Sequence, residues 1–194
     1  MIRTVFVDFD RTLFNTELFQ RLCWQEIGNA YNVDVEAAHA QMPAWYHQVG
    51  DLHYYSLDEQ LAAMFTQDTP DEIMATIRPK LASMAFSYPD AKEVFAWQKA
   101  GYEVHIVTFG EEWFQNTKRS FVPELAELPF HITLEQKGSF IASNFPDATG
   151  FMIDDKRNLD LPPAIREVWL NRVDNKQEAG ILTIHSLKAM EELL

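Results

Sequence analysis

The sequence predicts an α/β protein with a doubly wound parallel sheet and a helical insertion after its first strand. From about Tyr88 onward, short apolar strands alternate with helical segments, which is typical of right-handed βαβ units in a parallel sheet. Between an N-terminal strand and this region, the chain carries almost only helical patterns. We therefore expect residues 1–15 and 87–194 to form an α/β core and residues 16–86 to form a separate helical domain.

The composition is that of a globular protein with a strongly acidic surface. The chain has 194 residues, 47% of them hydrophobic, and a formal net charge of -13. Such a surface repels nucleic-acid phosphates and anionic lipids, so we expect neither as a partner. A small anionic substrate stays possible, because a metal ion and one or two lysines can reverse the potential locally.

Cysteine usage and the N-terminal sequence indicate the compartment. Cys23 is the only cysteine, so no intrachain disulfide can form, and its place in an amphipathic stretch indicates a small buried hydrophobe. The N-terminus has no signal-peptide pattern, and no apolar run is long enough to span a bilayer. We expect a cytoplasmic protein, monomeric or homodimeric.

The first strand is short and apolar, and the insertion follows it closely. Val5 to Val7 are β-prone and read as buried. The stretch "TELFQRLCWQEIGNAY" (16–31) predicts a helix with Thr16 as a candidate N-cap. Residues 34–49 predict a second helix, bent or broken at Pro43.

Two further helix starts are marked in the insertion. Ser56 with Glu59 three positions later has the pattern of a capping box. Thr69 is a candidate cap before Pro70, which suits the first helical position. Both signals predict helices in the second half of the insertion.

The core elements follow in alternation. Expected helices span 89–101, 111–121, 137–144 and 186–194, and expected strands span 102–110, 130–134, 150–154, 167–171 and 181–185. Gly101 should stop the first of these helices.

Polar residues with catalytic chemistry follow four of these strands. In an open parallel sheet, ligands bind beyond the carboxyl ends of the strands. The residues at these ends are Asp8, Asp10 and Thr12, then Thr108, then Lys137, and last Asp154 and Asp155. The carboxylates are the hard oxygen ligands that Mg²⁺ prefers, and a hydroxyl with an ammonium suits a phosphate. Zinc is not expected, because the six histidines show no ligand spacing.

Four short motifs carry a resemblance to a known family. "DFDRTL", the hydroxyl in "VTFG", the lysine in "EQKG" and "MIDD" resemble, in order, the four motifs of the haloacid dehalogenase (HAD) superfamily. The resemblance covers the whole chain and implies a Rossmann-like core. It also implies that residues 16–86 are the helical cap domain of that superfamily.

The resemblance implies a role for each motif residue. Asp8 matches the nucleophile that becomes an aspartyl phosphate, and Asp10 matches the general acid/base. Thr108 matches the phosphate-binding hydroxyl, and Lys137 matches the lysine that stabilises charge on the nucleophile and the phosphoryl group. For Mg²⁺, the implied ligands are Asp8, the backbone carbonyl of Asp10, Asp155 directly and Asp154, often through water.

The sequence departs from the family pattern at three places. Arg11 stands where the family usually has glycine, and Phe109 stands where asparagine is frequent. After the acidic pair, Asn158 and Asp160 lie near the position of a further family acid, in uncertain register. These departures affect the substrate more than the reaction.

Several chemically able residues have simpler structural interpretations. Thr12 fits a turn or cap hydroxyl, Asp160 fits an N-cap before "LPPAIRE", and His105 fits a satisfied core histidine. The aromatic cluster between Trp45 and Tyr55 fits either cap packing or a wall of the substrate pocket.

The implied activity is a Mg²⁺-dependent phosphatase acting on a small phosphorylated metabolite. A phosphotransferase or mutase with the same intermediate stays open, as does a catalytically weak, phosphate-binding regulatory protein. A signalling receiver domain also uses Asp, Thr, Lys and Mg²⁺, but there the acidic pair precedes the lysine.

The two carboxylates after the first strand raise each other's pKa. Replacing either Asp8 or Asp10 with asparagine should therefore not lower stability in metal-free buffer.

Overall fold

The computed structural model describes residues 3–174 and 176–194 and contains a six-stranded parallel sheet with β1 near its centre. The strand order is β5-β4-β1-β6-β7-β8. The strands are β1 Arg3–Val7, β4 Glu103–Phe109, β5 Phe130–Thr133, β6 Thr149–Asp154, β7 Ile165–Leu170 and β8 Leu182–Ile184. The chain leaves β1 toward one edge and returns beside β1 to build the other, so the doubly wound fold predicted from the sequence is confirmed.

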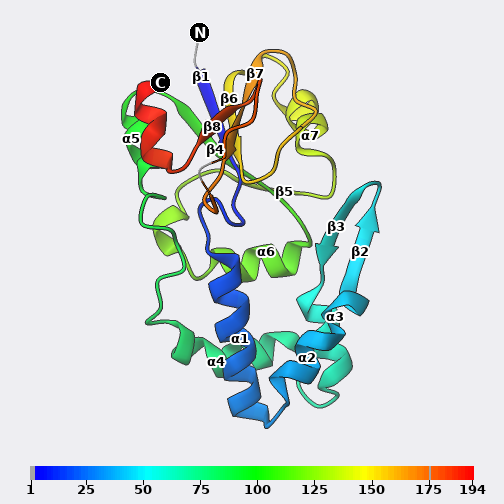
Figure 1. The fold of residues 1–194 in the computed structure, drawn as a ribbon. Coiled ribbons are helices and arrows are strands. Elements are labelled where there is room, and N and C mark those ends of the chain that lie inside the picture. Colours follow the sequence, from blue (N-terminus) through cyan, green and yellow to red (C-terminus); the bar gives the residue numbers. More distant parts are fainter. Residues whose placement is uncertain (1–2, 175) are drawn as a thin grey trace.

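Short helices connect the strands of the core (Figure 1). They are α5 Glu93–Lys99, α6 Glu112–Arg119 and α7 Lys137–Asn144, with 3-10 turns at Pro123–Leu125 and Leu187–Glu192. α5 ends before Gly101, whose φ of 94° requires a glycine, as predicted. The closing helix is a 3-10 helix rather than an α-helix. No helix begins at Asp160, so its predicted capping role is wrong.

A mostly helical segment is inserted between β1 and the rest of the core, as predicted. It contains α1 Thr16–Tyr31, α2 Val35–Gln41, a 3-10 turn at Met42–Trp45, α3 Leu57–Met64 and α4 Pro70–Leu81. These helices lie together at one end of the molecule, in the lower half of Figure 1. The boundaries 1–15, 16–86 and 87–194 stay predictions. No helix in the described part of the chain is long and apolar enough to cross a membrane.

The insertion also contains a β-hairpin that the sequence analysis missed. β2 (Tyr46–Val49) pairs antiparallel with β3 (Leu52–Tyr55). The helix predicted over 34–49 ends at Gln41, because Pro43 lacks an amide hydrogen and Tyr46 and Val49, further on, favour a strand. Gly50, with φ of 59°, forms the turn.

The two helix caps predicted in the second half of the insertion have different outcomes. At α4 the capping box is present, between Thr69 and Glu72. At α3 it is absent, because the hydroxyl of Ser56 donates to Asp58 at 2.6 Å instead of capping the helix. Glu59, its expected partner, lies 2.9 Å from His47 of the hairpin.

The N-cap of α1 is one residue earlier than predicted. The side chain of Asn15 accepts from the amide of Leu18 at 3.0 Å, so Thr16 is the first helical residue. Its hydroxyl is thereby free to donate to Asp10 at 2.5 Å. Because the N-cap is Asn15, Thr16 contacts Asp10 of the candidate site instead of capping the helix.

The two segments that connect the core to the insertion lie side by side, around residues 13–15 and 86–88. Asn15 donates its amide to the carbonyl of Phe86 at 2.7 Å, and Tyr88 donates to Leu13 at 2.9 Å. Four fully buried rings pack around this joint, with centroids 5.0–5.8 Å apart: Phe9, Phe14, Phe19 and Phe86. The packing fixes where the insertion meets the carboxyl end of β1.

Two residues with predicted structural roles are buried or half-buried. Cys23 is 1% exposed, and burial raises the pKa of its thiol to about 12, which makes it unreactive. His105 places its Nδ1 3.0 Å from Nε2 of His131, but its own Nε2 has no hydrogen-bond partner among the described residues. The prediction of a satisfied core histidine is therefore only half correct.

Candidate active site

The carboxyl ends of β1, β4 and β6 and the first turn of α7 meet at one cavity of about 180 Å³. Asp8, Asp10, Lys137 and Asp155 line it, as the sequence predicts, together with residues of the insertion. The cavity thus has one wall from the core and one from the hairpin.

Asp8 is held at the end of β1 by both its backbone and its side chain. Its amide donates to the carbonyl of Ile153 at 2.8 Å, which places its carboxylate beside β6. The Nζ of Lys137 donates to Oδ1 of Asp8, and the hydroxyl of Thr12 lies 3.4 Å from Oδ2. Thr12 therefore contacts the predicted nucleophile and is more than a turn residue.

Three carboxylates crowd together around Lys137. One oxygen each of Asp8, Asp154 and Asp155 lies within 4.8 Å of the others. Lys137 also donates to Asp154 at 2.6 Å. Burial raises the pKa of Asp8 well above its ordinary value, Lys137 opposes this rise, and the neighbouring carboxylates add to it.

The acidic group fits a divalent cation. Burial, followed by the charge of Asp154, raises the pKa of Asp155 to about 6. Lys137 bonds to Asp8 and Asp154, and the charges of Lys137, Lys156 and Arg11 oppose the rise at Asp155 without cancelling it. A further positive charge would therefore relieve the remaining repulsion among these carboxylates. Oxygen donors of this kind suit Mg²⁺, and Asp8, Asp154 and Asp155 are the residues able to hold it.

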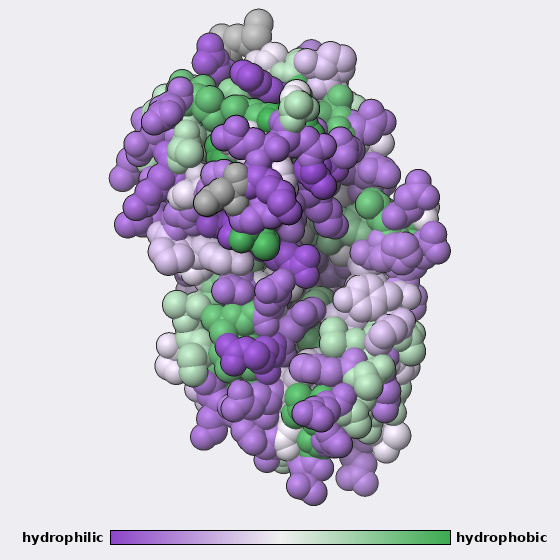
Figure 2. Space-filling model, in the orientation of Figure 1, coloured by the Kyte–Doolittle hydropathy of each residue, from purple (hydrophilic) through white to green (hydrophobic). Residues whose placement is uncertain are grey.

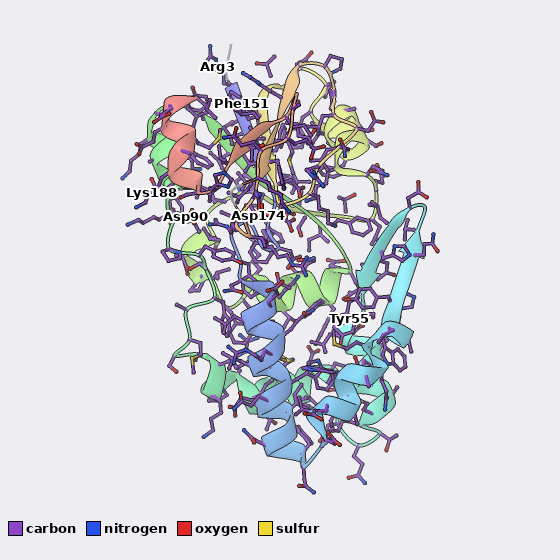
Figure 3. The ribbon with its side chains drawn as sticks, viewed as in Figure 1. Arg3, Tyr55, Asp90, Phe151, Asp174 and Lys188 are labelled. Carbon is purple, nitrogen blue, oxygen red and sulfur yellow. The ribbon has the colours of Figure 1, made fainter. Side chains whose placement is uncertain are left out.

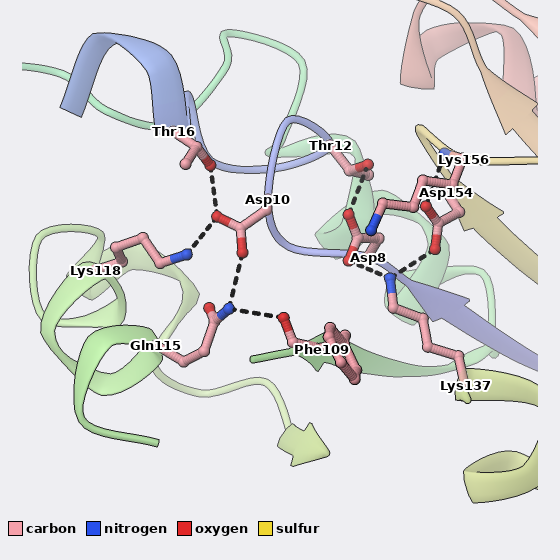
Figure 4. A network of polar contacts seen from close by, with 10 residues as sticks. All are labelled: Asp8, Asp10, Thr12, Thr16, Phe109, Gln115, Lys118, Lys137, Asp154 and Lys156. Atoms are coloured by element: carbon pink, nitrogen blue, oxygen red, sulfur yellow. Dashed lines mark hydrogen bonds and ion pairs between the residues drawn. The ribbon is translucent and has the colours of Figure 1, made fainter. Parts of the chain in front are cut away.

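Asp10 faces a different set of neighbours (Figure 4). Its Oδ1 accepts from Lys118 Nζ at 2.5 Å and from Thr16 Oγ1 at 2.5 Å, and its Oδ2 accepts from Gln115 Nε2 at 2.9 Å. Burial raises the pKa of Asp10, but the ion pair with Lys118 and the three hydrogen bonds outweigh burial and leave it below its ordinary value. This environment favours the ionised form of Asp10.

Lys118 and Gln115 belong to the candidate site through their contacts with Asp10, and the sequence analysis missed them. Both lie on α6, three positions apart and therefore on one face of the helix. Phe114 is buried beside them, and the ammonium of Lys118 lies 4.5 Å from the centroid of its ring. The spacing of Gln115 and Lys118 relative to Phe114 was the available signal, and it was weak because most other residues of α6 are polar as well. Gly110 leaves room for Gln115, because a Cβ there would lie 2.5 Å from Gln115 Nε2.

Thr108, the predicted phosphate-binding hydroxyl, does not line the cavity in this structure. It is the second-last residue of β4, pairs with Ile132 of β5 and is fully buried. Its Oγ1 has no hydrogen-bond partner within the described chain. A buried hydroxyl without a hydrogen-bond partner costs free energy of folding. A phosphate oxygen that reached Thr108 would accept a hydrogen bond from it and remove this cost.

The position of Lys137 depends on Gly138, the residue after it. A Cβ on Gly138 would lie 1.6 Å from the carbonyl oxygen of Asp160, so only glycine allows the first turn of α7 to lie against this loop. Asp160 is exposed and does not belong to the acidic group. Its contribution is a backbone contact, neither the predicted N-cap nor a metal ligand.

The other departures from the family pattern also have structural explanations. Arg11 has φ of 60°, a left-handed conformation that favours glycine, and its exposed side chain lies 3.5 Å from Glu17. Phe109 lines the cavity with its ring, and its carbonyl accepts from Gln115 at 3.1 Å. Asn158 also has a left-handed φ, of 59°.

Comparison with solved structures identifies the fold. A haloacid dehalogenase-like hydrolase from Burkholderia xenovorans superposes with a TM-score of 0.71 at 15% identity over 100% of this chain and 97% of that one. The HAD-hydrolase YfnB from Bacillus subtilis, solved bound to magnesium, gives 0.62 at 14% over 100% and 98%. A predicted phosphoglycolate phosphatase from Haemophilus somnus gives 0.57 at 15% over 99% and 97%. Neither protein-family models nor curated protein sequences match this chain.

These likenesses extend over the full length of both chains. The protein therefore has the haloacid dehalogenase-like fold, with a helical segment inserted after β1. The resemblance drawn from four short motifs and the predicted fold class are both confirmed at the level of the fold.

Proposed function

We propose that the protein is a Mg²⁺-dependent phosphatase that hydrolyses a small phosphorylated metabolite through an aspartyl phosphate on Asp8. The observation that carries this proposal is the environment of Asp8. Its carboxylate is buried, touches the ammonium of Lys137 and belongs to a group of three carboxylates that could hold a cation. One of the similar structures was solved with magnesium bound, which supports the choice of metal.

In the first half-reaction, a carboxylate oxygen of Asp8 attacks phosphorus and the bond to the leaving oxygen breaks. Lys137 lies against Asp8 and offsets the charge that gathers on the phosphoryl oxygens. Thr108 offers an unpaired hydroxyl for one of these oxygens if the phosphate enters deeply enough. Bound Mg²⁺ would supply positive charge that keeps Asp8 ionised and attracts the phosphate.

Asp10 would serve both half-reactions. Its ionised state suits the second one, in which it takes a proton from the water that attacks the aspartyl phosphate. To protonate the leaving oxygen in the first, Asp10 must gain a proton and give up at least one of its three hydrogen bonds. Because Thr16 begins α1, a movement of the inserted segment would change one of these bonds directly.

The expected substrate is small. The cavity of about 180 Å³ lies below the roughly 300–1,000 Å³ of pockets that hold drug-sized ligands. The net charge of -13 argues against nucleic acid and anionic membranes as substrates. Transfer of the phosphoryl group to an acceptor other than water uses the same residues, so a phosphotransferase is the second candidate.

A test of this proposal combines a substrate panel with metal removal. The purified protein is assayed on p-nitrophenyl phosphate and a panel of phosphorylated metabolites, in EDTA and after addition of Mg²⁺. We expect release of inorganic phosphate that depends on Mg²⁺ and is lost in Asp8→Asn. Full activity in EDTA would contradict the metal, and phosphate appearing only on a second metabolite would favour the transferase.

A further inference from the structure

The hairpin of the insertion forms an aromatic wall of the active-site cavity. Tyr46, His53, Tyr54 and Tyr55 line the cavity opposite Asp8 and its neighbours. Phe109 of the core packs edge-on against Tyr54 of this wall. The two ring centroids are 6.3 Å apart, at an interplanar angle of 71°. On the face drawn in Figure 2, the surface is indented between the core and the hairpin.

Contacts on both sides of the hairpin hold this wall in place. His47 stacks on Tyr54 with centroids 5.2 Å apart and lies 2.9 Å from Glu59 of α3. Tyr55 is buried, donates its hydroxyl to Gln60 and packs edge-on against Phe114 of α6 at 5.7 Å. Figure 3 shows Tyr55 between the base of the hairpin and α6. The wall is therefore preorganised and costs little ordering on binding.

Most polar groups of the cavity are already engaged with other partners. Gln115, Lys118 and Thr16 donate to Asp10. The carboxylate of Glu111 caps α6 by accepting from the amides of its first turn. These groups are therefore not available to hydroxyls of a leaving group, and a hydroxyl left unpaired beside them would cost binding energy. Gln20, His53 and Lys156 also line the cavity and could still meet a polar atom of the substrate.

A larger neighbouring cavity, of about 550 Å³, shares Arg11 and Asp155 with the first. It is a weaker candidate for the remainder of the substrate, because each cation lining it already faces a carboxylate. These pairs are Arg11–Glu17, Arg157–Glu178, Arg172–Asp90 and Lys176–Asp174.

We propose that Tyr54 and Phe109, whose rings already meet, form a stacking subsite, and that the substrate is a phosphate monoester whose alcohol carries one aromatic ring. This inference rests on the proposed function and adds the class of leaving group. The ring lies against Tyr54 of the hairpin and against Phe109, while the phosphate reaches Asp8 and Lys137. Phe109, which stands where the family resemblance predicts asparagine, thereby gains a role in specificity.

The test uses three monoesters with alkyl leaving oxygens, so that the reactivity of the leaving group stays similar: benzyl, cyclohexylmethyl and n-propyl phosphate. With Mg²⁺ present, kcat/KM for benzyl phosphate should exceed that for n-propyl phosphate by about tenfold, as expected for one or two aromatic contacts. It should also exceed that for the saturated ring. In Tyr54→Leu and Phe109→Leu the ratio of benzyl to n-propyl should fall to within about threefold of one, whereas Tyr54→Phe should keep it.

Tyr88→Leu is the matched control, because Tyr88 lines only the larger cavity. Equal rates on all three esters, or a ratio that changes in Tyr88→Leu and not in Tyr54→Leu, would overturn the subsite while the phosphatase stands. No hydrolysis of any phosphate ester would overturn the proposed function and this inference with it. Benzylphosphonate, which cannot be hydrolysed, should bind about tenfold more tightly than n-propylphosphonate to the wild type and not to Tyr54→Leu; equal binding to the wild type would overturn the subsite.

Discussion

The ammonium of Lys118 lies 2.5 Å from Oδ1 of Asp10, and Lys118 is only 2% exposed. The same carboxylate accepts from Thr16, the first residue of the inserted segment. One side chain at the end of β1 is thus tied to a core helix and to the start of the insertion. The sequence led us to expect that Asp10→Asn would not lower stability, because Asp8 and Asp10 repel each other. In the structure a cation balances Asp10, so this expectation changes.

Lys118→Met should lower both stability and activity. Methionine keeps much of the apolar stem but removes the charge, leaving Asp10 with an uncompensated, partly buried carboxylate. We expect a loss of about 3 kcal/mol in the free energy of unfolding. We also expect kcat to fall by roughly 10- to 100-fold, because Asp10 loses its orientation. Urea unfolding in metal-free buffer and initial rates with Mg²⁺ measure the two effects.

A double-mutant cycle separates the pair from its surroundings. Asp10→Asn alone should now destabilise the protein, and adding Lys118→Met to it should cost much less than Lys118→Met alone. Lys80→Met, at an exposed position on α4, should leave stability within about 0.5 kcal/mol. Additive losses in the double variant would show that the two groups do not interact in solution.

Magnesium binding should strengthen as pH rises through about 6. Burial raises the pKa of Asp155 to about 6, so the folded, metal-free protein binds a proton there that the unfolded chain releases near pH 4. The contribution of Asp155 to stability is therefore present below about pH 4 and lost as pH rises to about 6. Mg²⁺ must displace this proton, so 10 mM Mg²⁺ should raise the Tm more at pH 7.5 than at pH 5.0. In Asp155→Asn the increase should be small at both values, and an equal increase in the wild type at both would contradict the coupling.

The ion pair between Asp90 and Arg172 should hold the C-terminal part of the core in place. Arg172 donates to Asp90 at 2.8 and 3.1 Å and to the carbonyl of Thr12 at 2.9 Å, while Ser186 and the amide of Leu187 also donate to Asp90. Asp90→Asn should cost about 3 kcal/mol of the free energy of unfolding at pH 7, measured by urea unfolding. Asp147→Asn, in an exposed turn, is the control and should cost less than about 1 kcal/mol.

The same pair predicts a pH dependence. Burial raises the pKa of Asp90, but its bonds with Arg172, Ser186 and Leu187 outweigh burial and lower it. A lowered pKa means that the stabilisation is present above about pH 4 and is lost as pH falls through the folded pKa. The difference in Tm between wild type and Asp90→Asn should therefore shrink as pH falls from 5 to 3. A constant difference would place the effect in packing rather than charge.

The sequence predicts the parts of this protein that depend on strand order. Asp8, Lys137 and Asp155 each follow a strand or begin the helix after it, so a parallel sheet is sufficient to bring them to one edge. The partners of Asp10 were not predictable in this way. Lys118 lies 108 positions after Asp10, on a helix face whose orientation depends on packing.

The hairpin was missed for a related reason. Tyr46–Val49 and Leu52–Tyr55 are short and lie inside a helical segment, so the helical pattern around them dominated the interpretation. The alternating aromatic residues and Gly50 were the local signal. Which of the tyrosines face the cavity depends on the register of the pair, and the sequence alone does not fix it.

Gly138→Ala should displace Lys137 from the acidic group. A Cβ at this position would lie 1.6 Å from the carbonyl oxygen of Asp160, and a backbone atom cannot move away as a flexible side chain can. We expect a loss of about 1–3 kcal/mol in the free energy of unfolding and a lower kcat. Ser139→Ala, at the next and exposed position of α7, should change neither by much. An unaffected kcat in Gly138→Ala would show that the position of Lys137 is not critical.

Asp8→Asn should abolish turnover while leaving the fold intact. An amide nitrogen or oxygen cannot form the acyl phosphate, whereas asparagine keeps the size of the side chain and its contact with Lys137. Because burial and the neighbouring carboxylates raise the pKa of Asp8, removing its charge should not lower the Tm in metal-free buffer. Rapid acid quenching after exposure to a ³²P-labelled substrate should trap label in the wild type, and peptide mapping should place it on Asp8. Asp10→Asn should accumulate more label when the leaving group needs no proton, because its second half-reaction lacks a base. Label on any other residue, or a wild-type rate in Asp8→Asn, would exclude Asp8 as the nucleophile.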